Sequence, residues 1–214
     1  ETVIDLDALG KAEKENWVWG GSTCLGPSYR RCLVSLSRGG ADAKVVREFD
    51  SVAKAFVRGG FELPEAKTEL AWEDADRLLV ATDFGPGSLT DSGYPRIVKR
   101  WKRGTPLASA VTLFEVETKD VGVGVQVEHT PGHRRTVLTR AIDFFHQPRT
   151  LLEGHRLVPL DLPDDAEVAF WNHAGSADDT LLITLRSPLT LGERSFAGGS
   201  LLVVPELIAV TDAD

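Results

Sequence analysis

The chain has 214 residues, of which 42% are hydrophobic and 26% charged, and this composition excludes a disordered tail, a collagen-like rod and a coiled coil. Lys and Arg number 24 against 32 Asp and Glu, and the net charge of −8 opposes binding along a nucleic-acid backbone, which needs a basic face. No run approaches the roughly eighteen apolar residues of a membrane-spanning helix, so neither nucleic acid nor a membrane is an expected partner.

The N-terminus and the two cysteines bear on processing and compartment. Residues 1–5 have neither the basic nor the apolar region of a signal peptide, and the absence of methionine suggests a piece of a longer chain. Cys24 and Cys32 could pair, since seven residues separate them, but two free, buried thiols in a reducing compartment are commoner and are the expected state. A cytoplasmic location is therefore favoured.

In chain order, the sequence predicts one helix and then a dozen short strands. Good helix formers favour a helix over residues 6–16, which Gly10 interrupts. After Trp17, short runs rich in Val, Leu and Phe alternate with Gly, Pro and Asp turns, which is typical of antiparallel all-β proteins. The predicted strands are residues 31–37, 44–50, 70–72, 77–82, 96–101, 110–116, 121–128, 134–141, 156–160, 167–171, 180–185 and 200–204.

A degenerate repeat distinguishes among all-β folds. Pro64 precedes Trp72 by eight residues, and Pro163 precedes Trp171 by the same spacing, 99 residues further on. Half of that offset is close to the length of one four-stranded propeller blade, about 50 residues. An intermediate unit starting near Asp120 keeps the strand rhythm without the Pro and Trp. The Leu-Pro-acid segments suit connections between blades, because proline cannot donate in a central ladder.

The predicted fold is therefore all-β: a partial β-propeller of about four blades, each a four-stranded antiparallel sheet. Residues 1–30 would be a lead-in segment and the start of the first blade, residues 31–204 the blades, and residues 205–214 a truncated continuation. An arc of this size leaves two sheet faces uncovered unless it closes or continues, so we expect the isolated chain to self-associate.

Several segments resemble a known family. Residues 83–107, with Gly85-Pro86-Gly87-Ser88 and Tyr94-Pro95-Arg96, closely resemble the propeller region of bacterial prolyl oligopeptidase-like serine peptidases. Residues 16–19, 29–40 and 61–67 resemble it too, and beyond about residue 120 the likeness is mainly one of blade rhythm.

The resemblance implies most of the first half of a propeller whose C-terminal α/β-hydrolase domain, with its Ser-Asp-His triad, would be the main partner. It implies that the propeller gates the access of short peptides to that domain. The segments around Ser22 and Ser200 both fail the Gly-x-Ser-x-Gly pattern of a nucleophile elbow, and no helix follows either of them. We expect no catalytic residue, metal or cofactor in this chain, which should be inactive by itself although its parent would be a serine peptidase.

The long polar loop between the strands predicted at 77–82 and 96–101 is the best candidate for contact with substrate or with the hydrolase domain. Tyr94 and Arg96 are its preferred contact residues, and Arg186, at a strand end, is a further cavity-lining candidate.

Other groups have simpler interpretations. His129 and His133 flank a Pro-Gly turn, which favours a polar loop over a zinc site. The basic run 99–103 brackets Trp101, and a solvated strand with one Trp packed between blades is favoured over single-stranded nucleic-acid binding. Three pairs of acids are explained by the preference of Asp for turns, and they are Asp74 with Asp76, Asp164 with Asp165, and Asp178 with Asp179.

Two alternatives remain open. A free-standing, closed four-bladed propeller would bind a protein or peptide on one face, and its last strand would pair with its first blade. A propeller hydrolase would instead bring Asp74, Asp76 and Asp178 together in one pocket.

Overall fold

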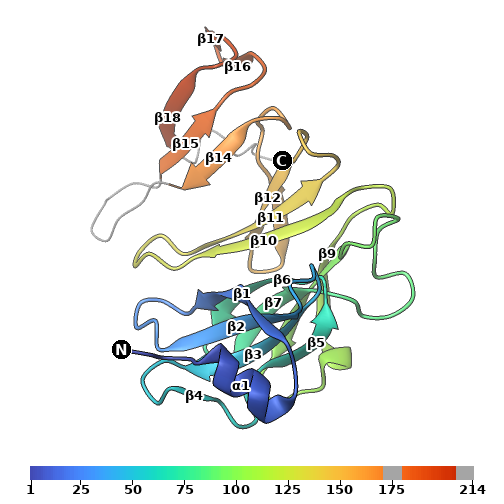
Figure 1. The fold of residues 1–214 in the computed structure, drawn as a ribbon. Coiled ribbons are helices and arrows are strands. Elements are labelled where there is room, and N and C mark those ends of the chain that lie inside the picture. Colours follow the sequence, from blue (N-terminus) through green and yellow to red (C-terminus); the bar gives the residue numbers. More distant parts are fainter. Residues whose placement is uncertain (171–179, 206–214) are drawn as a thin grey trace.

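The computed structural model describes residues 1–170 and 180–205. Consecutive antiparallel sheets follow one short helix, and Figure 1 shows them succeeding one another from the blue N-terminal part to the red C-terminal part. Trp171, His173, Asp178 and Asp179 lie outside the described residues, as does the predicted continuation beyond residue 205.

The first sheet has the order β1-β2-β3-β4, with β5 also paired to β3. Its strands are β1 (Trp17–Cys24), β2 (Arg31–Arg38), β3 (Lys44–Asp50), β4 (Ala55–Phe56) and β5 (Glu62–Ala66).

The second and third sheets are four-stranded antiparallel meanders, as predicted. The second consists of β6 (Glu69–Asp74), β7 (Arg77–Ala81), β8 (Ile97–Lys102) and β9 (Val111–Glu115), with a 3₁₀ turn, η1 (Leu107–Ser109), between the last two. The third consists of β10 (Gly122–Glu128), β11 (Arg135–Ala141), β12 (Arg149–Glu153) and β13 (Arg156–Pro159).

The fourth sheet shows three strands among the described residues, in the order β14-β15-β18, and a separate hairpin connects the last two. The strands are β14 (Glu167–Phe170), β15 (Thr180–Thr184) and β18 (Leu201–Pro205), and the hairpin is β16 (Leu189–Leu191) with β17 (Arg194–Phe196). Consecutive sheet units built from local sequence confirm the predicted propeller-type arc.

The helix α1 (Leu6–Glu13) covers the outer face of the first sheet. The side chain of Asp5 accepts a hydrogen bond from the Ala8 backbone N–H at 2.9 Å and caps the first turn. Lys14 adopts a left-handed conformation with φ 58°, so the helix ends earlier than the predicted residue 16. Leu6 and Leu9 pack against a buried cluster of this sheet that includes Trp17. One of the two faces expected to be open is thus covered by the chain itself.

Alternation along β7 explains why the second sheet is buried on both faces. Leu78 and Val80 belong to the core shared with the first sheet, whereas Leu79 and Ala81 belong to the core shared with the third sheet. All four side chains are fully buried. Successive strand residues point to opposite faces, so a continuous apolar run is what a sheet packed between two others requires.

Aromatic rings fill the seam between the first two sheets. Phe61 makes edge-on contacts with Trp72 at 5.7 Å and with Trp101 at 4.9 Å between ring centroids. The Trp72 indole N–H donates to the Thr23 carbonyl at 2.9 Å, which links β6 to β1. The prediction that Trp101 packs between blades is confirmed.

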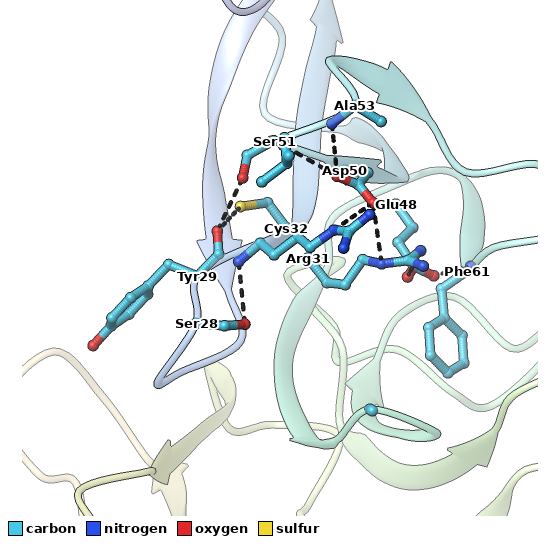
Figure 2. A network of polar contacts seen from close by, with 12 residues as sticks. Ser28, Tyr29, Arg31, Cys32, Glu48, Asp50, Ser51, Ala53 and Phe61 are labelled. Carbon is cyan, nitrogen blue, oxygen red and sulfur yellow. Dashed lines mark hydrogen bonds and ion pairs between the residues drawn. The ribbon is translucent and has the colours of Figure 1, made fainter.

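A buried carboxylate joins the same two sheets, and Figure 2 shows its contacts within the first sheet. Glu48 accepts hydrogen bonds from Arg31 at 3.1 Å and from the Phe61 backbone N–H at 2.9 Å. Arg103, from the end of the second sheet's third strand, donates to the same carboxylate at 2.7 Å. Since the Glu48 side chain is fully buried, these donors compensate for its lost hydration. The basic run is therefore less solvated than the sequence suggested.

Two sequence-based expectations were wrong. Cys24 and Cys32 form a disulfide rather than two free thiols, because the β1–β2 pairing places them directly opposite each other. Pro64 lies inside β5 rather than in a connection between blades. It is tolerated there because β5 lies at the edge of the sheet and its pairing with β3 is irregular at that point.

Neither alternative architecture is supported by the described part of the chain. Within residues 1–170 and 180–205, β18 pairs with β15 and not with the first sheet, so the ring does not close there. Asp74 and Asp76 lie at the β6–β7 turn, where they pair with Arg77 and Arg103 respectively. The acids of the hypothetical hydrolase are thus turn residues, apart from Asp178, which is not described.

Candidate functional site: an aromatic rim with a pocket

In each of the first three sheets, one connection joins the second strand to the third. These connections lie at the same end of the successive sheets, because each sheet is an up-and-down meander. The first strands β1, β6 and β10 also contact one another in that order. These connections are residues 39–43, 82–96 and 142–148. The Val123 backbone N–H donates to the Pro95 carbonyl at 3.1 Å, and Gly122, beside Tyr94, pairs with Ala141, immediately before the third connection.

Exposed aromatic side chains gather at this end of the sheets. Five aromatic residues in the described parts of the chain are classed as exposed, and four of them belong here: Trp19, Tyr94, Phe144 and Phe145. We call this surface the aromatic rim. The fifth, Tyr29, lies in the β1–β2 connection at the opposite end. Clustered exposed rings are typical of an interaction surface, since single exposed apolar residues are ordinarily scattered.

The loop that carries Tyr94 is held in place by hydrogen bonds of its own residues. The Ser88 hydroxyl donates to the Gly85 carbonyl at 2.6 Å and accepts from the Phe84 backbone N–H at 2.9 Å. Thr90 accepts from the Tyr94 backbone N–H and donates to the Val121 carbonyl, both at 3.2 Å. Ser88 and Thr90 are buried, whereas the Tyr94 side chain is 40% exposed. The loop thus presents Tyr94 from a fixed support.

Arg96 fixes the base of that loop. Its guanidinium donates to the carbonyls of Val116 and Gly87, each at 2.8 Å, and to the Glu115 carboxylate at 2.5 Å. Its side chain is 14% exposed, so most of its donors are engaged within the chain. The sequence predicted Tyr94 and Arg96 as contact residues, and the structure places them together on the same loop with different surroundings.

Arg186 lies two residues after the end of β15, in the connection between β15 and β16. Its guanidinium pairs with Glu167 at 2.6 Å, and both side chains are more than half exposed. The structure brings it into neither the Tyr94 loop nor the rim pocket described below.

The Phe144–Phe145 turn was missed by the sequence reasoning. These rings are 83% and 61% exposed, yet the turn beneath them is well ordered by hydrogen bonds. Asp143 accepts from the backbone N–H groups of Phe145 at 2.7 Å and His146 at 2.8 Å, and from the His146 ring at 2.7 Å. Two adjacent phenylalanines between an Asp and a His, in a stretch separating two strands, were the available signal.

The charges of this turn reinforce one another. The His146 ring, followed by the two backbone donors, lowers the pKa of Asp143 to about 2. The Asp143 carboxylate in turn raises the pKa of His146.

A depression of about 460 Å³ opens beside Tyr94, and we call it the rim pocket. It lies between the start of β1, the β2–β3 turn and the start of β6. Its residues are Val18, Trp19, Gly20, Ser37, Gly40, Ala41, Asp42, Lys44, Lys67, Thr68, Glu69, Tyr94 and Pro95. Desolvation by the surrounding walls raises the pKa of Glu69, and the nearby Lys44 opposes that shift without cancelling it. A concave site with aromatic walls and a perturbed carboxyl has the features of a ligand site.

The histidines predicted to lie in a polar loop do so. His129 and His133 flank the turn at residues 130–132, and the His129 ring bonds to the Trp72 carbonyl at 2.8 Å. The described residues contain no group of three or more His, Cys, Asp and Glu side chains arranged to hold a metal ion. Their one α-helix is too short and polar to cross a membrane.

Curated relatives of the chain are named as peptidases. A protein of Sinorhizobium fredii named uncharacterized peptidase y4nA is 41% identical over 171 residues, which are 77% of this chain and 24% of that protein. A protein of Rickettsia prowazekii named uncharacterized peptidase RP174 is 27% identical over 218 residues, covering 95% of this chain and 30% of that protein. The chain therefore spans less than a third of the length of these relatives. No family model matches it.

Solved structures extend this similarity. A post-proline cleaving enzyme from Rickettsia typhi superposes with a TM-score of 0.87 at 25% identity, over 100% of this chain and 32% of that enzyme. Oligopeptidase B from Leishmania major superposes with a TM-score of 0.65 at 13% identity, over 98% of this chain and 27% of that protein. At 13% identity the second likeness concerns the fold.

Proposed function

The chain matches the N-terminal, propeller part of prolyl oligopeptidase-like peptidases, and we propose that it gates the access of short peptides to a C-terminal hydrolase domain of the parent polypeptide. The aromatic rim would be the face that docks on that domain. The chemistry would belong to the hydrolase domain, since this chain has no Gly-x-Ser-x-Gly elbow.

One observation carries the proposal: four of the five exposed aromatic side chains in the described residues lie on one rim. Burying Phe144 and Phe145 against a partner removes large apolar surfaces from water, and the hydrogen-bonded turn beneath them limits the entropy lost on docking.

Docking at this rim would produce selection by size. A rigid stack of sheets placed over a catalytic cleft leaves narrow routes to it, and a short extended peptide can pass where a folded domain cannot. The core packing between consecutive sheets supports this role, because it holds the second sheet firmly against the first and the third.

The test uses the full-length parent peptidase with the pair Phe144→Ser and Phe145→Ser. We expect cleavage of a long peptide to rise relative to that of a short one by about tenfold, since one lost anchor of an interface is worth about 1.4 kcal/mol or more. Tyr29→Ser, which removes the exposed aromatic of the opposite end, is the matched control and should leave the ratio unchanged. Equal ratios in all three proteins would refute docking through this rim.

A further inference from the structure

The rim pocket holds two ammonium groups that the chain anchors without neutralising them. Lys44 Nζ donates to the Gly20 carbonyl at 3.1 Å, and Lys67 Nζ lies 3.8 Å from the centre of the Tyr94 ring. A carbonyl and a ring face fix the position of an ammonium without forming an ion pair with it. Within residues 1–170 and 180–205, neither lysine has an acidic partner within ion-pair distance.

The arginines at the opposite end of the sheets differ in this respect. Arg103 pairs with Glu48 and Arg77 with Asp74, so these cations are neutralised by the fold. The two lysines come from different sheets, at the start of β3 and just before β6, and converge on the same depression. Two positioned cations in one concave site, neither held in a direct ion pair within the described residues, favour an anionic ligand.

The acids of the pocket form no direct ion pair with these lysines, although Lys44 acts on Glu69 electrostatically. Glu69 and Asp42 both line the depression, yet neither forms an ion pair with Lys44 or Lys67 in the described structure. Burial raises the pKa of Glu69, so its carboxyl is neutralised more readily than an exposed one. Protonation of Glu69 therefore removes one of the two negative charges that would oppose an incoming carboxylate, and Asp42 carries the other.

The walls of the pocket specify what accompanies the anion. Trp19 is 48% exposed, Tyr94 is 40% exposed, and Val18 and Pro95 complete an apolar border. These surfaces suit a ligand with an apolar group beside its negative charge, in contrast to a bare inorganic anion.

We propose that the rim pocket binds a carboxylate-bearing peptide, with Lys44 and Lys67 holding the carboxylate and Trp19 and Tyr94 packing against the neighbouring apolar side chain. The shared chemistry is an organic carboxylate, from a free peptide C-terminus or from an Asp or Glu side chain. The inference rests on the proposed function for the source of the peptide, since the pocket opens on the rim that would face the cleft.

The first experiment measures binding to the chain as it stands, by titration calorimetry. The probes are N-acetyl-Ala-Phe with a free carboxylate, the same peptide as its C-terminal amide, and N-acetyl-Glu-Phe amide. We expect saturable binding of the free acid and an affinity at least about tenfold lower for the Ala-Phe amide, as for the loss of one charge-assisted contact. Binding of the Glu-Phe amide at the level of the free acid would assign the contact to any carboxylate, and its failure would assign it to the C-terminus.

Variants test the residues themselves. Lys44→Gln combined with Lys67→Gln should abolish the preference for the acid, whereas Lys11→Gln, on an exposed face of α1, is the control and should preserve it. Binding by the wild-type chain should weaken as the pH rises through the pKa of Glu69, because the Glu69 carboxylate then repels the ligand. Glu69→Gln should remove that decline and bind the ligand more tightly above this pKa. The other charged and titratable groups that line the pocket with Glu69 are Lys44, Lys67, Asp42 and Tyr94.

Equal affinity of the wild-type chain for acid and amide, or no binding of either, would overturn the inference. That comparison needs no variant, so a misfolded protein cannot produce it. It also leaves the docking proposal standing, because docking is tested with Phe144 and Phe145 in the parent peptidase.

Discussion

The two ends of the stacked sheets differ in how they treat charge and aromatic surface. At one end, which we call the paired rim, lie the connections β1–β2, β6–β7, β8–β9 and β10–β11. Arg103 joins Glu48 and Asp76 there, and the His129 ring bonds to the Trp72 carbonyl. The aromatic rim at the other end exposes rings, and its pocket holds two lysines that form no ion pair within the described residues. Polar groups satisfied within the fold stabilise it, whereas groups left unsatisfied at a fixed position are available to a partner.

The largest expected effect is at the paired rim. Glu48→Ala leaves Arg31 and Arg103 without their buried partner and the Phe61 N–H without an acceptor. We expect the free energy of unfolding to fall by about 3 to 5 kcal/mol, measured by urea denaturation.

The control for this change is Glu65→Ala, which removes an exposed carboxylate paired with Arg38 and should cost no more than about 1 kcal/mol. A Glu48→Ala variant as stable as the Glu65→Ala variant would mean that the buried network does not hold the first two sheets together.

The disulfide of the paired rim should have the next largest effect. Cys24→Ser with Cys32→Ser opens a closed loop of sequence separation 8, and we expect a loss of about 2 to 3 kcal/mol in the free energy of unfolding. Reductant should destabilise the wild-type chain and leave the double variant unaffected. A variant that unfolds at the same urea concentration as the oxidised wild type would contradict this.

The next effect in size concerns self-association of the chain, which we expect to involve the fourth sheet. Leu201 and Val203 on β18 are 65% and 57% exposed, while Leu202 between them is buried. Among the described residues, α1 covers the outer face of the first sheet, whereas this apolar face of β18 stays exposed and is available to another copy. Leu201→Ser with Val203→Ser should raise the dissociation constant by about tenfold in light scattering, as expected for a few buried apolar groups. A wild-type chain that stays monomeric at all concentrations would refute the prediction.

The smallest effect is the response of the Phe144–Phe145 turn to pH. Because the pKa of His146 is raised, the protonated ring stabilises the turn fully below the ordinary histidine pKa of 6.5. This stabilisation is lost as the pH rises through the raised pKa. The lowered pKa of Asp143, about 2, means that its contribution is present above 3.8 and is lost as the pH falls toward 2.

The turn should therefore be most ordered between about pH 4 and 6.5. Amide hydrogen exchange at Phe145 and His146, corrected for its intrinsic pH dependence, should accelerate above that window. Asp143→Asn should remove the His146-dependent change, and an unchanged profile in that variant would show that the pair does not order the turn.

Local sequence was sufficient to predict most strands and their grouping. The apolar run at residues 77–82 predicted β7, and its alternation between two cores follows from the strand period of two. The 99-residue spacing between Pro64 and Pro163 suggested consecutive sheet units, although the two prolines occupy different positions. Pro64 lies in the edge strand β5, whereas Pro163 lies in the connection between β13 and β14.

The candidate site was only partly predictable. Tyr94 was found because a long Gly-rich loop between two strands is a local feature. Lys44, Lys67 and Trp19 were missed because no pattern in the sequence relates residues on β1, on β3 and before β6. Arg96 was expected to serve contacts with a partner, but the Val116 and Gly87 carbonyls that engage it become its neighbours only when the loop folds over β8 and β9.

The order of apolar, polar and turn residues by itself determined an all-β chain of consecutive antiparallel units, because strand alternation and turn preferences act over a few residues. Tertiary structure decided the pairing of Cys24 with Cys32, the burial of Glu48 beside Arg103 and the meeting of Lys44 with Lys67 around one pocket. Each of these depends on strand register or on how one sheet stacks on the next, and both are fixed by packing between residues distant in the sequence.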